Sequence, residues 1–142
     1  MAKEMTEMDP LAQSLVGLFF SLEQIYETSA EEIGVSRQQA QLLCVADYKN
    51  PALGEVADAL HCDKTNVTGL VDRVERQGLI ERVPDENDRR VTRIALTSKG
   101  RNAVSRFHYE LNERLQGFGG SLNLDARTVK QLTEHLNSQG IS

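Results

Sequence analysis

The decisive stretch of this 142-residue sequence is residues 63–78, DKTNVTGLVDRVERQG. Asp63 suits a helix N-cap, because its carboxylate can accept hydrogen bonds from the first backbone N–H groups, and Gly78 suits a C-terminal stop. Four aliphatic residues between them recur at i, i+3, i+4 and i+7: Val67, Leu70, Val71 and Val74. This spacing places them on one buried face of an amphipathic helix whose other face is polar.

Two further helices are predicted upstream of this stretch. Ser36 and Gln39 form a capping box that opens a helix reaching about Asp47, and residues 48–51, YKNP, end it. A short helix follows at about residues 53–60, although no Ser, Thr, Asp or Asn stands ready to cap it. A short helix, a tight turn and a second amphipathic helix make a helix-turn-helix, which sets the second helix into the DNA major groove.

Downstream of residue 78, the helical spacing of apolar residues gives way to a pattern typical of β-strands. Residues 79–83 and 91–96 are rich in β-branched residues and predict two strands, joined by the polar stretch 84–90, PDENDRR. This hairpin with a long tip is a wing. Thr97 then caps a fifth helix, residues 117–120 break it, and Asn123 is expected to cap a last helix.

Both ends of the chain carry apolar helical stripes. The first helix opens at Asp9-Pro10 and carries Leu11, Leu15, Leu18, Leu22 and Ile25, and the last carries Val129, Leu132 and Leu136. One small winged domain has no place for these stripes, which favours a homodimer. The predicted fold is therefore mainly α with a small β-hairpin. A winged helix-turn-helix over residues 36–100 lies between dimerisation helices in residues 1–35 and 101–142.

Charge and composition limit the classes of function that the sequence allows. The net charge is −5, yet residues 64–106 hold ten cations against six anions, so a basic centre lies between acidic arms. Two cysteines are too few for a disulfide framework, and no leader or membrane helix is expected, which favours the cytoplasm and no membrane partner. No Gly-rich phosphate loop, nucleophile elbow or zinc-ligand spacing is present, so no enzyme activity, cofactor or metal is expected.

The polar face of the central helix and the wing tip are the candidate DNA contacts. The candidates are Lys64, Thr65, Asn66, Thr68, Gly69 and Arg73 on the helix and Asp88, Arg89 and Arg90 on the wing. Asn can pair with adenine, Thr can contact a thymine methyl, and Lys or Arg can reach guanine or phosphate. A projecting Arg suits a narrow minor groove. The alternative is an ordinary solvated surface, as in a winged helix that binds proteins and has no DNA target.

These features together resemble the MarR (multiple antibiotic resistance regulator) family. The resemblance is carried by D88-x-R90, L96-T97-x-x-G100, and the run from Val67 to Arg82. It implies a dimer that binds double-stranded DNA at a pseudo-palindromic operator and represses a nearby operon. It also implies that Arg90 reaches the minor groove with Asp88 as its partner.

The resemblance further implies release from DNA by a small ligand or by oxidation. Cys62 adjoins the turn before the central helix and is the redox candidate, with a structural role as the alternative. The aromatic residues Phe19, Phe20, Tyr26 and Phe107 are candidates for an effector pocket, although aromatic residues at helical spacing are more often core or interface residues.

Overall fold

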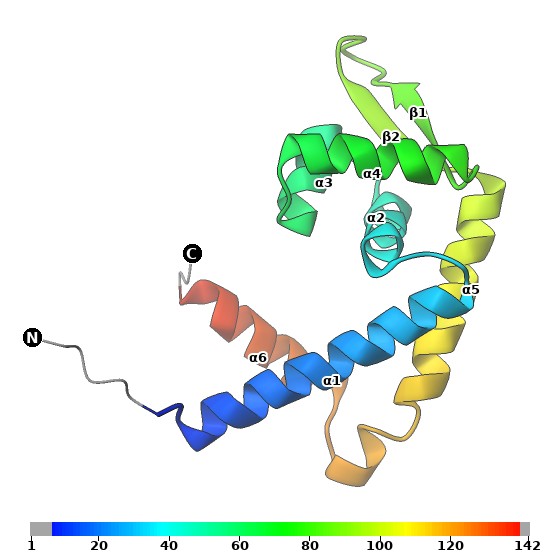
Figure 1. Ribbon diagram of the computed structural model, residues 1–142. Helices are drawn as coiled ribbons and strands as arrows, with labels where there is room; N and C mark the ends of the chain where they lie inside the picture. The colour runs from blue at the N-terminus through cyan, green and yellow to red at the C-terminus, as the bar shows by residue number, and fades with distance from the viewer. Residues whose placement is uncertain (1–6, 140–142) are drawn as a thin grey trace, which may run out of the picture.

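The computed structural model describes residues 7–139, which form helices and one small hairpin that projects at one end of the molecule (Figure 1). The elements are α1 (Pro10–Glu32), α2 (Arg37–Tyr48), α3 (Leu53–Leu60), α4 (Lys64–Arg76), β1 (Ile80–Pro84), β2 (Thr92–Leu96), α5 (Ser98–Leu115), the 3-10 turn η1 (Gly120–Leu122) and α6 (Ala126–Ser138). The predicted class, mainly α with a small β-hairpin, is confirmed. None of the helices described has the length and apolarity that a bilayer crossing requires.

Local capping chemistry sets the start of most helices. Ser36 and Gln39 form the predicted capping box at α2, and Asp63 accepts a hydrogen bond from the Asn66 N–H at 2.8 Å at α4. Thr97 caps α5 in the same way. Each of these caps satisfies a backbone donor that the helix leaves without an internal partner.

Two helix starts differ from a simple cap. At α3, the N-cap Ala52 offers no side-chain acceptor, and Glu55 reaches back to accept its N–H at 3.2 Å. The expectation that Asn123 caps the last helix is wrong. Asn123 adopts a left-handed conformation with φ 52°, which Asn tolerates, and ends η1, while Asp125 accepts the Thr128 N–H at 2.7 Å and caps α6.

The hairpin is antiparallel and joins the helix-turn-helix through a short bridge. Val83 pairs with Arg93 in the register of β1 and β2. On the other edge of β2, the Ile94 N–H donates to the Pro51 carbonyl at 2.8 Å, and Ala52 bridges Arg93. The base of the wing is thus hydrogen-bonded to the loop between α2 and α3.

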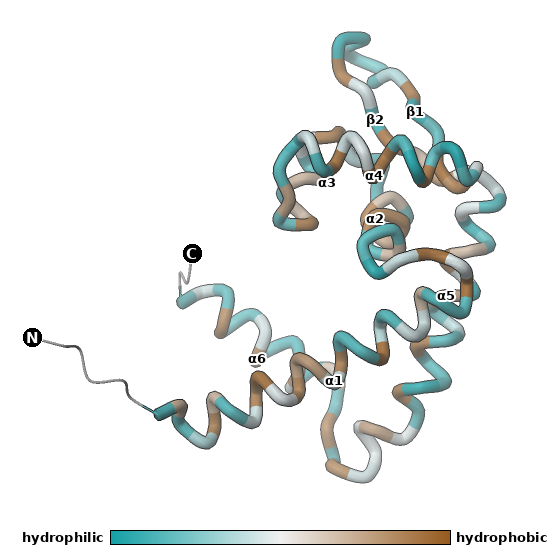
Figure 2. The backbone as a smooth tube through the Cα atoms, viewed as in Figure 1, coloured by the Kyte–Doolittle hydropathy of each residue, from teal (hydrophilic) through white to brown (hydrophobic). Residues whose placement is uncertain are grey.

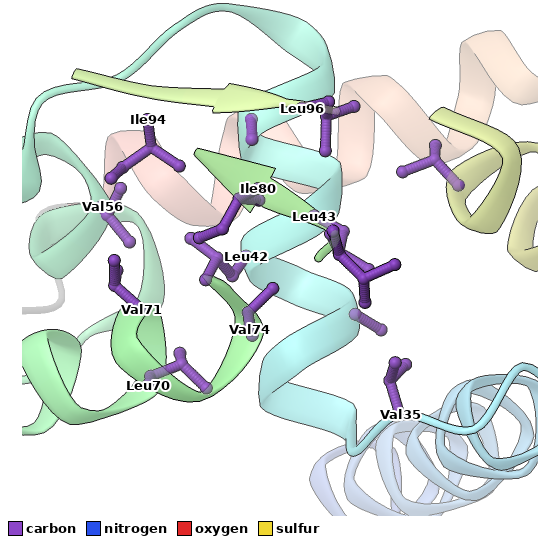
Figure 3. Close-up of a cluster of buried hydrophobic side chains, with 14 of the residues drawn as sticks. Val35, Leu42, Leu43, Val56, Leu70, Val71, Val74, Ile80, Ile94 and Leu96 are labelled. Atoms are coloured by element: carbon purple, nitrogen blue, oxygen red, sulfur yellow. The ribbon is translucent and has the colours of Figure 1, made fainter. Parts of the chain in front are cut away.

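One apolar core holds the winged domain together (Figure 3). The four aliphatic residues predicted for the inner face of α4 are all buried, and they pack with Leu42 of α2, Val56 of α3, Ile80 of β1 and Ile94 of β2. The start of α5 also packs tightly on the hairpin. A Cβ at Gly100 would lie 1.9 Å from the Leu79 carbonyl oxygen, so only glycine fits there.

The outer helices leave their apolar stripes uncovered. Leu15 of α1 is 56% exposed and Leu132 of α6 is 63% exposed, and α6 contributes no buried residue. Figure 2 shows hydrophobic segments along both α1 and α6. These surfaces contrast with α4, whose apolar face is fully covered.

Candidate nucleic-acid interface

Helix α4 and the hairpin lie at one end of the molecule, away from α1 and α6 (Figure 1). Because Val67, Leu70 and Val71 face the core, the side chains between them face outward. The predicted contacts Lys64, Thr65, Asn66, Thr68 and Arg73 are exposed, and Gly69 is half-buried. The structure therefore brings all six residues predicted on this helix to its outer side.

Several of these polar groups already have partners within the helix. The Asn66 amide donates to Asp63 at 3.4 Å, and the Thr68 hydroxyl donates to the Lys64 carbonyl at 2.9 Å. The Thr68 oxygen keeps its acceptor capacity after that bond. These bonds hold both side chains close to the first turns of α4, where the helix also presents its unpaired N–H groups.

Gly69 creates a gap on the outer face. A Cβ built there would meet only the flexible Arg73 side chain, with Nη1 at 3.7 Å, which is ordinary contact. Its backbone does not require glycine, since it lies within a regular helix. Nothing in the packing of the described residues explains a glycine at this position, although glycine weakens a helix relative to alanine.

The wing tip holds one arginine in a fixed orientation. The Arg90 guanidinium donates to both carboxylate oxygens of Asp88, from Nε at 3.1 Å and from Nη2 at 3.3 Å. This contact holds the pKa of Asp88 below its ordinary value. Arg90 remains 91% exposed, and Arg89 is exposed with no ion pair among residues 7–139. Two guanidiniums thus project from the tip, one of them oriented by its neighbour.

A second cluster, where the strand pair meets the wing tip, was not predicted from the sequence. Asp85 accepts the backbone N–H groups of Asn87 and Asp88, each at 2.9 Å, and also a hydrogen bond from Arg93. The Arg93 hydrogen bond and the two amides hold the pKa of Asp85 below its ordinary value. Arg93 also contacts Glu55 of α3 at 3.4 Å. The signal available in the sequence was a charged arginine within an otherwise uncharged strand.

Another arginine neutralises the acidic residues of α4. Arg82 of β1 pairs with Asp72 at 2.6 Å and with Glu75 at 2.8 Å, and these contacts raise the pKa of the guanidinium. Arg73 and Arg76 of the same helix make no ion pair within the described part of the chain. The outer face of α4 therefore presents unneutralised cations, while its carboxylates are occupied.

The predicted aromatic residues separate into different environments. A hollow of about 230 Å³ between α1 and α2 is lined by Phe19, Leu22, Glu23, Tyr26, Arg37 and Gln41, and an Arg37–Glu23 ion pair lies in its wall. Phe107 is buried beside Tyr26, with ring centroids 4.8 Å apart. Phe20 is exposed and does not line the hollow. The structure thus brings Phe19 and Tyr26 together there, and leaves Phe20 and Phe107 outside it.

The two cysteines are also in different settings. Burial raises the pKa of the Cys44 thiol. The Cys62 thiol donates to the Leu60 carbonyl at 3.3 Å and lies 3.7 Å from the Gln38 amide, so it joins the turn before α4 to α2. No group of three metal-ligating side chains occurs between residues 7 and 139.

Comparison with known proteins agrees with this architecture. The sequence profile of the MarR family matches residues 36–92. The transcriptional activatory protein BadR of Rhodopseudomonas palustris is 32% identical over 117 residues, which cover 72% of this chain and 67% of BadR. The chain spans about half the length of several other curated regulators that it matches.

Solved structures share the fold over nearly the whole chain. CouR from Rhodococcus jostii, bound to p-coumaroyl-CoA, has a TM-score of 0.79 at 22% identity, covering 94% of this chain and 93% of CouR. A variant of S. aureus MepR bound to an oligodeoxyribonucleotide has a TM-score of 0.63 at 21% identity, covering 93% and 96% of the two chains. The profile match and the similarity to BadR, supported by this shared fold, show that the chain belongs to the MarR family of transcriptional regulators.

Proposed function

We propose that this chain is a dimeric, sequence-specific DNA-binding regulator that represses a nearby operon. In this proposal α4 enters the major groove through Lys64, Thr65, Asn66, Thr68, Gly69 and Arg73, and the wing places Asp88, Arg89 and Arg90 at the flanking minor groove. The single observation that carries it is the exposed Arg90 guanidinium, held by Asp88 at the tip of a hairpin beside the polar face of α4. The DNA-bound structure of a MepR variant, which shares this fold, supports the assignment.

A second copy of the chain is the proposed partner of the exposed stripes on α1 and α6. Leu15, Leu18 and Leu132 are each more than two-fifths exposed, and burying such surface on a twofold-related copy is favourable. The two α4 helices of such a dimer would bind half-sites roughly 34–36 Å apart, which is one turn of DNA. The predicted operator is accordingly pseudo-palindromic.

Release by a small ligand or by oxidation completes the proposal. The hollow lined by Phe19 and Tyr26 lies where α1 meets the winged domain, so a ligand there would act on the junction between the two. CouR, which shares the fold, was solved with an aromatic acyl-CoA bound. For oxidation, Cys62 is the candidate because its hydrogen bonds connect the turn before α4 to α2.

The test begins with recovery of the genomic DNA fragments that the chain retains at physiological salt. Affinity for a recovered fragment is then measured by fluorescence anisotropy across salt concentrations for the parent and for Arg90→Ala. The matched control is Arg127→Ala, which removes the same charge from exposed α6. We expect Arg90→Ala to bind roughly tenfold more weakly with a salt slope reduced by about one, and Arg127→Ala to bind like the parent.

The outcomes separate the proposed function from its rival. Retention of no DNA, with binding of a protein partner instead, would favour a winged-helix interaction module. Equal affinity of Arg90→Ala and the parent at every salt concentration would show that the wing does not contact DNA. A reporter gene behind the recovered site then separates repression from activation, the activity named for BadR.

A further inference from the structure

The orientation of the wing tip depends on one carboxylate at its base. Asp85 is only 15% exposed, and it accepts the N–H groups of Asn87 and Asp88 at 2.9 Å each. Asp88 in turn accepts three hydrogen bonds from Arg90, one from its backbone N–H and two from its guanidinium. The position of the Arg90 guanidinium therefore follows from the position of Asp85, through hydrogen bonds that all lie within the tip.

A single side chain connects this carboxylate to the helix-turn-helix. Nε of Arg93 donates to Asp85, and its Nη1 donates to the Asn50 carbonyl at 2.9 Å and to Glu55 at 3.4 Å. Asn50 precedes α3, and Glu55 lies in its first turn. One guanidinium thus spans the gap between the wing and the loop that precedes the helix-turn-helix.

We propose that Arg93 is a positioning residue that sets the wing against the helix-turn-helix and so places Arg90 for the minor groove. This inference rests on the proposed DNA-binding function and assigns no DNA contact to Arg93 itself. Its side chain is about one-third exposed, and its Nε and Nη1 are directed to protein acceptors. The ladder bonds pair β1 with β2 as far as Pro84 and Thr92, whereas Arg93 binds Asp85, the first residue of the tip beyond that pair.

Arginine is suited to this role, and lysine is not. Its planar fork holds donors at fixed angles, so one side chain can bind Asp85 and the loop before α3 at the same time. A lysine ammonium keeps the charge but carries it at one point on a flexible stem. Arg93→Lys therefore removes the planar geometry of the guanidinium while keeping its charge. Arg93→Gln removes both the guanidinium geometry and the charge.

The first measurement needs no DNA. Amide hydrogen exchange followed by NMR reports whether Asp85 still holds the N–H groups of Asn87 and Asp88. We expect Arg93→Lys and Arg93→Gln to exchange these two amides roughly tenfold faster than the parent, with amides in the core of α4 unchanged. The matched control is Lys49→Gln, which removes the other cation bound to Glu55, at 2.7 Å, without touching the wing.

The second measurement is a double-mutant cycle on DNA affinity. We expect Arg93→Lys to weaken binding to a recovered operator roughly fivefold to tenfold, and Lys49→Gln to bind like the parent. If Arg93 acts through Arg90, the double variant Arg90→Ala/Arg93→Lys binds no more weakly than Arg90→Ala alone. Urea unfolding midpoints of all variants identify any that lose the fold.

The results distinguish the positioning role of Arg93 from the proposed DNA-binding function. Protected Asn87 and Asp88 amides in Arg93→Lys, or additive losses of affinity in the double variant, would overturn the positioning role. If the parent chain retains no specific DNA, the proposed function fails instead. The exchange measurement then still decides whether Arg93 orients the wing.

Discussion

Replacing Gly69 by alanine should strengthen the fold and weaken DNA binding at the same time. The glycine lies inside α4 on its outer side, with regular helical backbone. Alanine in a helix interior is more favourable than glycine by about 1 kcal/mol. Because a Cβ would meet only Arg73 Nη1, at 3.7 Å, no clash offsets this gain. The free energy of unfolding of Gly69→Ala should therefore rise by about 1 kcal/mol, or roughly 3 °C in melting temperature.

The expected loss appears only with DNA present. If α4 lies in the major groove, the gap at Gly69 is filled by the sugar-phosphate backbone or by a base edge. A methyl group forced into a packed contact costs about 1–3 kcal/mol, so affinity for the operator should fall by roughly tenfold or more. Urea unfolding and fluorescence anisotropy on the same preparations measure the two effects separately.

Gly17→Ala provides the matched control. Gly17 also lies within a helix, with no atom within 4 Å of a built Cβ, and it falls off the leucine stripe of α1. Its replacement should stabilise the chain by a similar amount and leave DNA affinity unchanged. Parental operator affinity in Gly69→Ala would refute a close approach of DNA at that position.

Three further predictions concern the dimer, the wing and the thiols. Leu132→Glu places a charge on the exposed stripe of α6, so it should convert the proposed dimer to a monomer in sedimentation velocity. A dimer that persists in this variant would exclude α6 from the interface. Hydrogen bonds from Arg93 and from two backbone amides lower the pKa of Asp85. The ionised Asp85 carboxylate therefore stabilises the folded state above about pH 4, and this stabilisation is lost as the pH falls through the lowered pKa. An NMR titration of that carboxyl should therefore show no change between pH 5 and 8, and a midpoint there would contradict the contacts. Cys44 should be alkylated by iodoacetamide more slowly than Cys62 at pH 7, because burial raises the Cys44 pKa and disfavours its reactive thiolate. Peptide mass spectrometry measures the two alkylation rates.

Local chemistry explains which parts of the fold were predictable. The capping box at Ser36 and the cap at Asp63 involve residues three apart, so the sequence contains all of the interaction. At residues 123–125, Asn and Asp both suit a cap. Which of the two caps α6 depends on the backbone, because Asn123 takes the left-handed conformation that closes η1 and leaves the cap to Asp125. The predicted start of α6 was therefore wrong.

Long-range ion pairs explain what could not be predicted at the candidate site. From the charge count of the sequence alone, Arg82 and Arg93 were expected to belong to a basic surface. In the structure Arg82 is occupied by two carboxylates of α4, and Arg93 by Asp85 and by Glu55, which lies 38 positions earlier. The exposure of the α4 face and of the wing tip was nevertheless predictable, because helical periodicity and a polar turn are local signals.

The missing side chain at Gly100 has a mechanical consequence. Since the first turn of α5 rests directly against the Leu79 carbonyl, the helix and the start of the hairpin have no room to slide past one another. The 18 residues of α5 make a lever about 27 Å long. A displacement of about 2 Å at the far end of α5 therefore corresponds to a rotation of about 5° at the contact with the hairpin. The smallest residue in the chain thus makes the junction between α5 and the hairpin stiff.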